Sequence, residues 1–101
     1  MIPVIIEDIK KIGWKWCTVD QLVSPGPVFL LAVMLTSTGA GAAQVTIRNG
    51  HNTGGEIVLQ VSALANYTSP VSPVYPIYLD KGLFVDVGSN VQGVLIIYYQ
   101  E

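Results

Sequence analysis

Apolar and polar side chains alternate with a period of two along most of the chain after residue 13. In residues 14–20, Trp14 and Trp16 fall on one side and Lys15 falls on the other. β-branched and aromatic residues dominate such runs, and glycine, proline or asparagine separates them. These are the signals of short, half-buried β-strands. The pattern predicts strands at residues 14–20, 28–36, 44–48, 56–61, 77–79, 83–87 and 93–99.

Residues 44–61 carry a hairpin signal. One alternating run ends at Asn49-Gly50, a strong turn dipeptide, and a second run follows the pair Gly54-Gly55. We therefore expect an antiparallel hairpin with its loop around residues 49–55. The alternation places these side chains of the hairpin on the core side: Val45, Ile47, Ile57, Leu59 and Val61.

Two runs, residues 28–35 and 94–99, are apolar on both faces. A strand of this kind has to be covered on both sides. One face of each run is expected in the core, and the other is expected against a further surface. These two runs are therefore the first places to look for contact with a neighbouring subunit.

The segment at residues 66–76 contains Pro70, Pro73 and Pro76. Proline lacks the N–H that a strand donates to its neighbour, so it confines the chain to sheet edges or loops, and we expect a long connection here. Turn signals recur every eight to twelve residues. The whole pattern predicts an all-β fold of seven or eight short strands, an antiparallel β-sandwich or jelly roll that spans residues 13–101 as a single domain.

The first twelve residues differ from the rest, with five isoleucines followed by a break at Gly13. The spacing of Ile5, Ile9 and Ile12 fits one helical face, but an isolated helix of this length is marginal in water. We interpret residues 1–12 as an N-terminal arm that packs on its own domain or reaches a neighbour. Its candidate interface residues are Ile2, Ile5, Ile6 and Ile9.

Charged residues are few and bunched. The chain of 101 residues has five basic and seven acidic side chains and a net charge of −2. No charge occurs in residues 21–47, 57–79 or 87–100. Soluble monomers usually keep apart from their neighbours through mixed surface charge, so these gaps predict surface that other protein covers. The small net charge argues against nucleic acid as a partner.

A membrane span is not expected either. The longest apolar run, residues 28–35, has eight residues, whereas a membrane-spanning helix needs roughly 20. The start of the chain lacks the basic segment and cleavage site of a secretory signal, and Glu7 and Asp8 follow its first apolar residues. We expect a protein that is made in the cytosol and stays there until it assembles.

The residues that could carry chemistry are isolated from one another in the sequence. His51 is the single histidine and is interpreted as a solvated loop residue, and the single Cys17 excludes an internal disulfide. Asp80 and Asp86 flank a short strand and are interpreted as a turn residue and an outer-face residue. Weaker alternatives are a carboxylate pair, with Glu56 as a third candidate, or a calcium site that includes Asn90. We expect no enzyme activity, no metal and no cofactor.

The aromatic side chains leave three interpretations open. Trp14 and Trp16 share a face, and Tyr98 and Tyr99 lie near the other end of the sequence. They could belong to the core, anchor a protein interface or stack on a sugar ring. The candidate interface residues outside the arm are Trp14, Trp16, Phe29, Leu31, Tyr98 and Tyr99.

Residues 81–87, with the sequence Lys-Gly-Leu-Phe-Val-Asp-Val, are followed by the apolar closing run at 94–99. With the hairpin at 45–55, this makes residues 26–100 similar to small all-β structural proteins of tailed bacteriophage particles. The resemblance carries no catalytic residues. It implies a virion component: a capsid cement or decoration protein, a head-to-tail component or a tail component.

The leading hypothesis is a non-enzymatic protein that binds the outside of major capsid subunits and stabilises the phage head. Its expected partners are the major capsid protein or other virion proteins, and further copies of itself, with a trimer as one candidate by analogy. Its expected location is the virion, assembled in the host cytoplasm. The alternatives are a head-to-tail or tail component, and a small carbohydrate-binding β-sandwich module.

Overall fold

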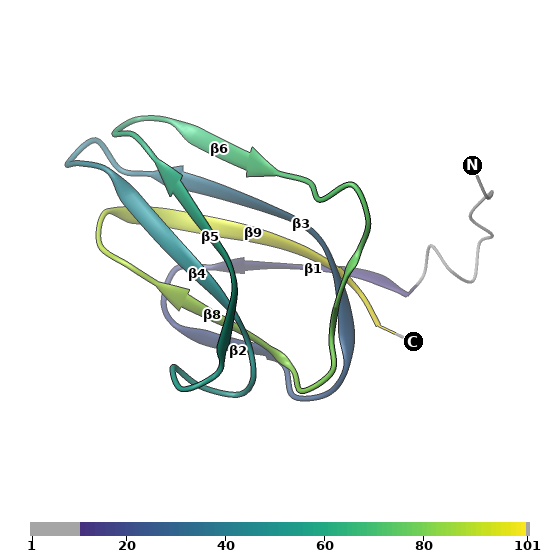
Figure 1. The fold of residues 1–101 in the computed structure, drawn as a ribbon. Helices are drawn as coiled ribbons and strands as arrows, with labels where there is room; N and C mark the ends of the chain where they lie inside the picture. The colour runs from purple at the N-terminus through teal and green to yellow at the C-terminus, as the bar shows by residue number, and fades with distance from the viewer. Residues whose placement is uncertain (1–10, 101) are drawn as a thin grey trace.

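The computed structural model describes residues 11–100, and the chain forms nine strands within them (Figure 1). There is no helix in this part of the chain, so the all-β prediction is confirmed. The strands are β1 (Ile12–Cys17), β2 (Gln21–Ser24), β3 (Val28–Ser37), β4 (Ala43–Asn49), β5 (Glu56–Ala63), β6 (Thr68–Val71), β7 (Ile77–Leu79), β8 (Leu83–Val87) and β9 (Val91–Tyr99).

The strands form two antiparallel sheets. Sheet A has the order β1-β9-β3-β6, with the short β7 also paired to β3, and sheet B has the order β2-β8-β4-β5. The two longest strands, β3 and β9, are the two runs that the sequence marks as apolar on both faces, and they pair with each other at the centre of sheet A. Strands from opposite ends of the chain, β1 and β9, lie side by side in that sheet (Figure 1).

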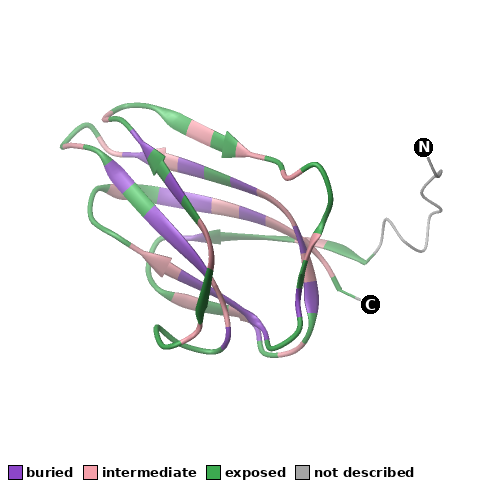
Figure 2. Cartoon of the chain, viewed as in Figure 1, coloured by how far each residue is buried: buried purple, intermediate pink, exposed green. Residues whose placement is uncertain are grey.

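One hydrophobic core lies between the two sheets. Sheet A contributes alternate residues of β3 and β9, and sheet B contributes alternate residues of β4 and β8, as the buried segments in Figure 2 show. Burial of these aliphatic side chains is the main source of the fold's stability. The largest of the fully buried side chains are Leu30, Leu35, Ile47, Leu79, Leu83 and Ile96.

The predicted hairpin is present as β4 and β5, but Ile57 lies on the side opposite to the one expected. The register shifts between the pairs Ile47↔Leu59 and Arg48↔Ile57, which leaves Val58 as an extra residue in β5. A β-bulge of this kind reverses the alternation on one side of it. Ile57 therefore leaves the core side and is 51% exposed.

Two short strands were not predicted. β2 follows a corner at which the chain passes from sheet A to sheet B, and the Asp20 side chain accepts a hydrogen bond from the Val87 N–H at 2.7 Å beside it. β6 falls within the segment expected to be a connection. Its Pro70 is tolerated because β6 pairs only with β3, at the edge of the sheet.

The boundary of the predicted arm shifts slightly. Ile12 belongs to β1 and pairs with Tyr99, and the Gln100 N–H donates a hydrogen bond to the carbonyl of Lys11 at 3.1 Å. The arm candidates Ile2, Ile5, Ile6 and Ile9 lie outside the described residues.

Candidate functional site

The outer face of sheet A, which points away from sheet B, is the most distinctive surface of the molecule. Two rows of paired residues cross its centre, Trp14-Ile97-Ala32 and Trp16-Leu95-Met34, and directly paired residues share a face. We define the outer face by Ile12, Trp14 and Trp16 of β1, Gly93, Leu95, Ile97 and Tyr99 of β9, Phe29, Ala32, Met34 and Thr36 of β3, Thr68 and Pro70 of β6, and Tyr78 of β7.

Within residues 11–100, no side chain on this outer face is an acid or a strong base. Lys15 belongs to the same strand as the two tryptophans, but it pairs with Ile96 and points to the other side of the sheet. The uncharged surface therefore runs without interruption across five strands.

Large apolar groups on this face meet solvent. Trp14 is 70% exposed, Trp16 is 44% exposed and Tyr78 is 56% exposed. The total surface area is about 250 Å² for a tryptophan and about 200 Å² for a tyrosine, so these three side chains alone expose roughly 400 Å². A patch of a few hundred Å² that is contiguous and apolar is a usual mark of an interaction site.

Trp16 is held in place by a glycine of the neighbouring strand. A Cβ atom added to Gly93 would overlap the Cζ2 and Cε2 atoms of the indole, so the ring lies directly on the glycine backbone. Gly93 is buried as a result. A glycine inside an apolar strand can mark such a close approach, and this signal was available in the sequence.

The outer face is hollowed at the end near Tyr99. A hollow of about 270 Å³ is lined by Pro27, Val28, Phe29, Tyr78 and Tyr99. The ring of Phe29 lies 5.0 Å from that of Tyr78 and 6.2 Å from that of Tyr99, measured between ring centroids. These contacts order the aromatic groups before any partner arrives.

The structure brings together four of the sequence-predicted interface residues. Trp14, Trp16, Phe29 and Tyr99 all lie on the outer face. Leu31 lies at the irregularity between Leu30 and Ala32 in β3 and is half-buried.

Tyr98 lies on the opposite side of β9 from the outer face. It is paired with Gly13 and packs against the core cluster. Outer-face residues that were not among the predicted interface residues include Ile12, Ala32, Met34, Tyr78, Leu95 and Ile97.

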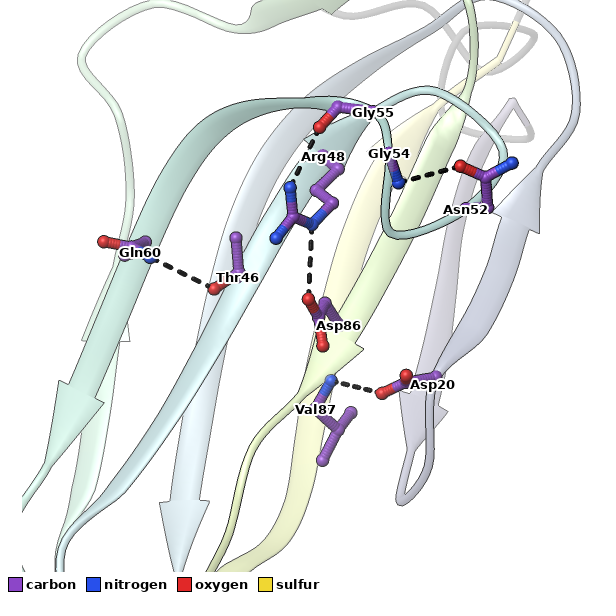
Figure 3. Close-up of polar contacts among 9 residues, drawn as sticks. All are labelled: Asp20, Thr46, Arg48, Asn52, Gly54, Gly55, Gln60, Asp86 and Val87. Atoms are coloured by element: carbon purple, nitrogen blue, oxygen red, sulfur yellow. Dashed lines mark hydrogen bonds and ion pairs between the residues drawn. The ribbon is translucent and has the colours of Figure 1, made fainter.

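The outer side of sheet B is chemically different. There Arg48 pairs with Asp86, with 3.2 Å between Nε and Oδ2, and also donates from Nη1 to the Gly55 carbonyl at 3.0 Å (Figure 3). The Gln60 side chain donates a hydrogen bond to the Thr46 hydroxyl at 3.3 Å. Asp86 was predicted to lie on an outer face and does so. The outer side of sheet B thus carries charged and polar groups beside the exposed Leu22 and Ile57, whereas the outer side of sheet A is uncharged.

His51 has a structural position at one end of the molecule. It is exposed, as predicted for a loop residue, but its Nε2 lies 2.7 Å from the Pro25 carbonyl and 2.8 Å from the Lys81 carbonyl. Because both neighbours are acceptors, Nε2 carries the proton. The side chain therefore ties the β4–β5 loop to the turns before β3 and before β8.

The acidic candidates are held in separate contacts. The Asn49 side chain donates to Asp80 with 2.7 Å between Nδ2 and Oδ1, and this hydrogen bond lowers the pKa of the exposed carboxyl, with a smaller lowering from Lys81. Asp86 is paired with Arg48. No group of three or more potential metal ligands occurs among residues 11–100.

Cys17 is a buried free thiol in the core. Burial raises its pKa, while the nearby Lys15 acts in the opposite direction. In the described part of the chain, no helix is long and apolar enough to cross a membrane.

Comparison with known proteins gave no match: no family model fits the chain, and no curated protein and no solved structure matches it. Function has to be inferred from the geometry and chemistry of the outer face.

Proposed function

We propose that this chain is a non-enzymatic structural protein that assembles with other protein subunits through the outer face of sheet A. The observation that carries this proposal is a strand surface free of charge that presents Trp14 and Trp16 to solvent. Aromatic side chains are enriched at the centre of protein interfaces, and charged residues are depleted there. The polar contacts of sheet B leave that side suited to water.

We further propose that the fold is a β-sandwich of the jelly-roll type. Four antiparallel pairs are nested along the chain, β4 with β5, β3 with β6, β2 with β8 and β1 with β9. One long hairpin that rolls up into two sheets would produce this nesting, with β7 as a short addition at the edge of sheet A. Double-sheet jelly rolls occur in viral capsid proteins and in lectins.

In its most specific form, the proposal is a virion protein of a tailed bacteriophage that is assembled in the host cytoplasm. It would act as a capsid cement or decoration protein that binds the outside of major capsid subunits and stabilises the head. The resemblance at residues 81–87 and 94–99 supports this assignment, and those residues fall on β8, the two residues before it, and β9. Strand β9 also supplies the central residues of the outer face.

The test is the abundance of the chain in purified particles. Particles from cells that produce the chain would be separated on a density gradient, and the ratio of this chain to the major capsid protein would be measured by quantitative mass spectrometry. A decoration protein is expected in high copy number. A few copies per particle would favour the head-to-tail or tail alternative, and absence from particles would refute the virion assignment.

A carbohydrate-binding module is the second candidate. The exposed Trp14 and the hollow beside Tyr78 are features that could stack on sugar rings. A glycan array, followed by titration of tryptophan fluorescence, separates the two functions. A saturable response that Trp14→Ala abolishes would favour sugar binding, whereas an assembly protein gives no such response.

A further inference from the structure

We propose that the outer face of sheet A is the interface of a symmetric homodimer, in which a second copy of this chain docks face to face across a two-fold axis. This inference rests on the proposed assembly function and deepens it, because it names the occupant of the face. Three features of the face support a second copy: its area, its lack of charge and the sizes of its side chains.

The exposed area is sufficient for a stable interface. A standard interface removes about 800 Å² from each partner. The two tryptophans and Tyr78 expose roughly 400 Å², and the remaining outer-face residues bring the total to the order of 800 Å². Among those residues, Ile12 is 41% exposed and Met34 is 40% exposed.

The absence of charge makes the face compatible with itself. In a two-fold interface the same patch lies on both subunits, so any charged group near the axis would be buried against an identical charge. The described outer face holds no such group, whereas the outer side of sheet B carries Arg48 and Asp86. A dimer through sheet A would bury the uncharged surfaces and leave the charged ones in water.

In one of the two central rows, the sizes of the side chains are also complementary under this symmetry. Across the sheet, the row Trp14-Ile97-Ala32 runs from a large residue to a small one. A two-fold axis that runs parallel to β9 and passes over Ile97 sets Trp14 of one copy opposite Ala32 of the second copy. Sheets that pack face to face in this aligned way lie about 10 Å apart, the distance that interdigitated side chains fill.

One of the two tryptophans is ordered before association. The Trp16 indole lies on Gly93, so its rotamer does not have to be fixed when the dimer forms. Pre-organised aromatic groups bind with a smaller loss of conformational entropy. Trp14 is the more exposed of the two and is the expected anchor.

The full chain can be tested by sedimentation velocity over a series of concentrations, together with tryptophan emission excited at 295 nm. Both tryptophans of the chain lie on this face, so the emission reports on it alone. We expect a concentration-dependent dimer whose emission shifts to longer wavelength as it dissociates on dilution.

Charge insertion on the face supplies the variants. Trp14→Lys and Met34→Lys should each raise the dissociation constant by about 100-fold or more, because each dimer receives the change twice. The matched control is Ile57→Lys, at a similarly exposed apolar position on sheet B, which should leave the dimer unchanged. Far-UV circular dichroism confirms that each variant is folded.

The outcomes separate this inference from the proposed function. The two-fold dimer is overturned if the wild-type chain stays monomeric or forms a trimer. It is also overturned if the Trp14→Lys variant remains dimeric. If the free chain is monomeric but Trp14→Lys abolishes its association with particles, a different protein occupies the face, and only the assembly function survives. If the dimer behaves as expected but the chain never enters particles, the dimer stands and the virion assignment fails.

Discussion

Replacing Gly93 with alanine tests whether the indole of Trp16 is held by the glycine beneath it. The added Cβ would overlap the Cζ2 and Cε2 atoms of the ring, so the indole has to swing away from β9. The backbone at Gly93 does not adopt a positive φ, unlike Gly82 at 147°, so alanine introduces no backbone strain of its own. The whole cost therefore comes from the displaced ring.

The magnitude follows from the covered area of the indole. Trp16 is 44% exposed, so more than half of its surface is in contact with protein. With about 250 Å² for the whole side chain, roughly 140 Å² is covered. Loss of half to all of this contact costs about 2 to 3.5 kcal/mol at ~25 cal/mol per Å². Alanine in a strand is more stable than glycine by roughly 0.5 to 1 kcal/mol, because it loses less backbone entropy on folding. This partly offsets the lost contact, so the net destabilisation should be about 2 kcal/mol.

A double-mutant cycle measures this coupling. Unfolding in urea would be followed by far-UV circular dichroism for the wild type, Gly93→Ala, Trp16→Ala and the double variant. Once Trp16 is absent the clash is gone, so Gly93→Ala should become neutral or stabilising by roughly 0.5 kcal/mol. Equal destabilisation by Gly93→Ala in both backgrounds would refute the close contact between the ring and the glycine.

Gly13 supplies a matched control on the other side of the same sheet. A Cβ atom there would lie 3.1 Å from the Cζ and Oη atoms at the far end of the Tyr98 side chain. That contact is tight but short of an overlap, and the end of the ring can move by a few tenths of an ångström. Gly13→Ala should therefore cost clearly less than Gly93→Ala in the same urea experiment.

Three further predictions concern polar groups and the buried thiol. His51→Ala should lower the free energy of unfolding by about 1 kcal/mol in urea, because it removes the donor shared by the Pro25 and Lys81 carbonyls, whereas the neighbouring Thr53→Ala should change little. Asn49→Ala should remove the hydrogen bond that lowers the pKa of Asp80. Part of the loss in unfolding free energy relative to wild type should therefore be present near neutral pH and fade as the pH falls below about 4. A loss that stays constant down to about pH 2 would contradict this assignment. Cys17 should react with a thiol reagent only as fast as the core opens, and rapid labelling of native protein would contradict its burial. The free energy of unfolding should also fall as the pH rises above about 8.5, because the thiolate is disfavoured only in the folded state.

The sequence predicted those parts of the fold that depend on local pattern. The alternation of residues 44–48 and 56–61 is visible without any knowledge of the rest of the chain, and the hairpin forms there. The side to which Ile57 points depends on the extra residue Val58, which forms a bulge only because β5 pairs with β4 in one register. Such an irregularity leaves no signal in the alternation itself.

An irregularity in register also prevented the alternation from predicting the individual residues of the candidate site. Residues 28–35 were identified as apolar on both faces, but strict alternation would group Phe29 with Leu31 and Val33. The irregularity between Leu30 and Ala32 instead leaves Val33 in the core and pairs Ala32 with Ile97 on the outer face. The sequence could therefore identify the strands of the site, whereas its individual residues required the register of β3 on β9.

The register of β3 on β9 helps to explain where the chain lacks charge. Residues 21–47 and 87–100 lack charge partly because β3 and β9 fill the core, which would be true of any two-sheet protein. Their other sides need not be apolar for folding, since one face of an antiparallel sheet can be polar and solvated. Sheet B follows that ordinary pattern with Arg48 and Asp86, and it does so in the same molecule and around the same core. The lack of charge on the outer side of sheet A is therefore not required by the core between the sheets, and under the proposed function another protein would cover that side.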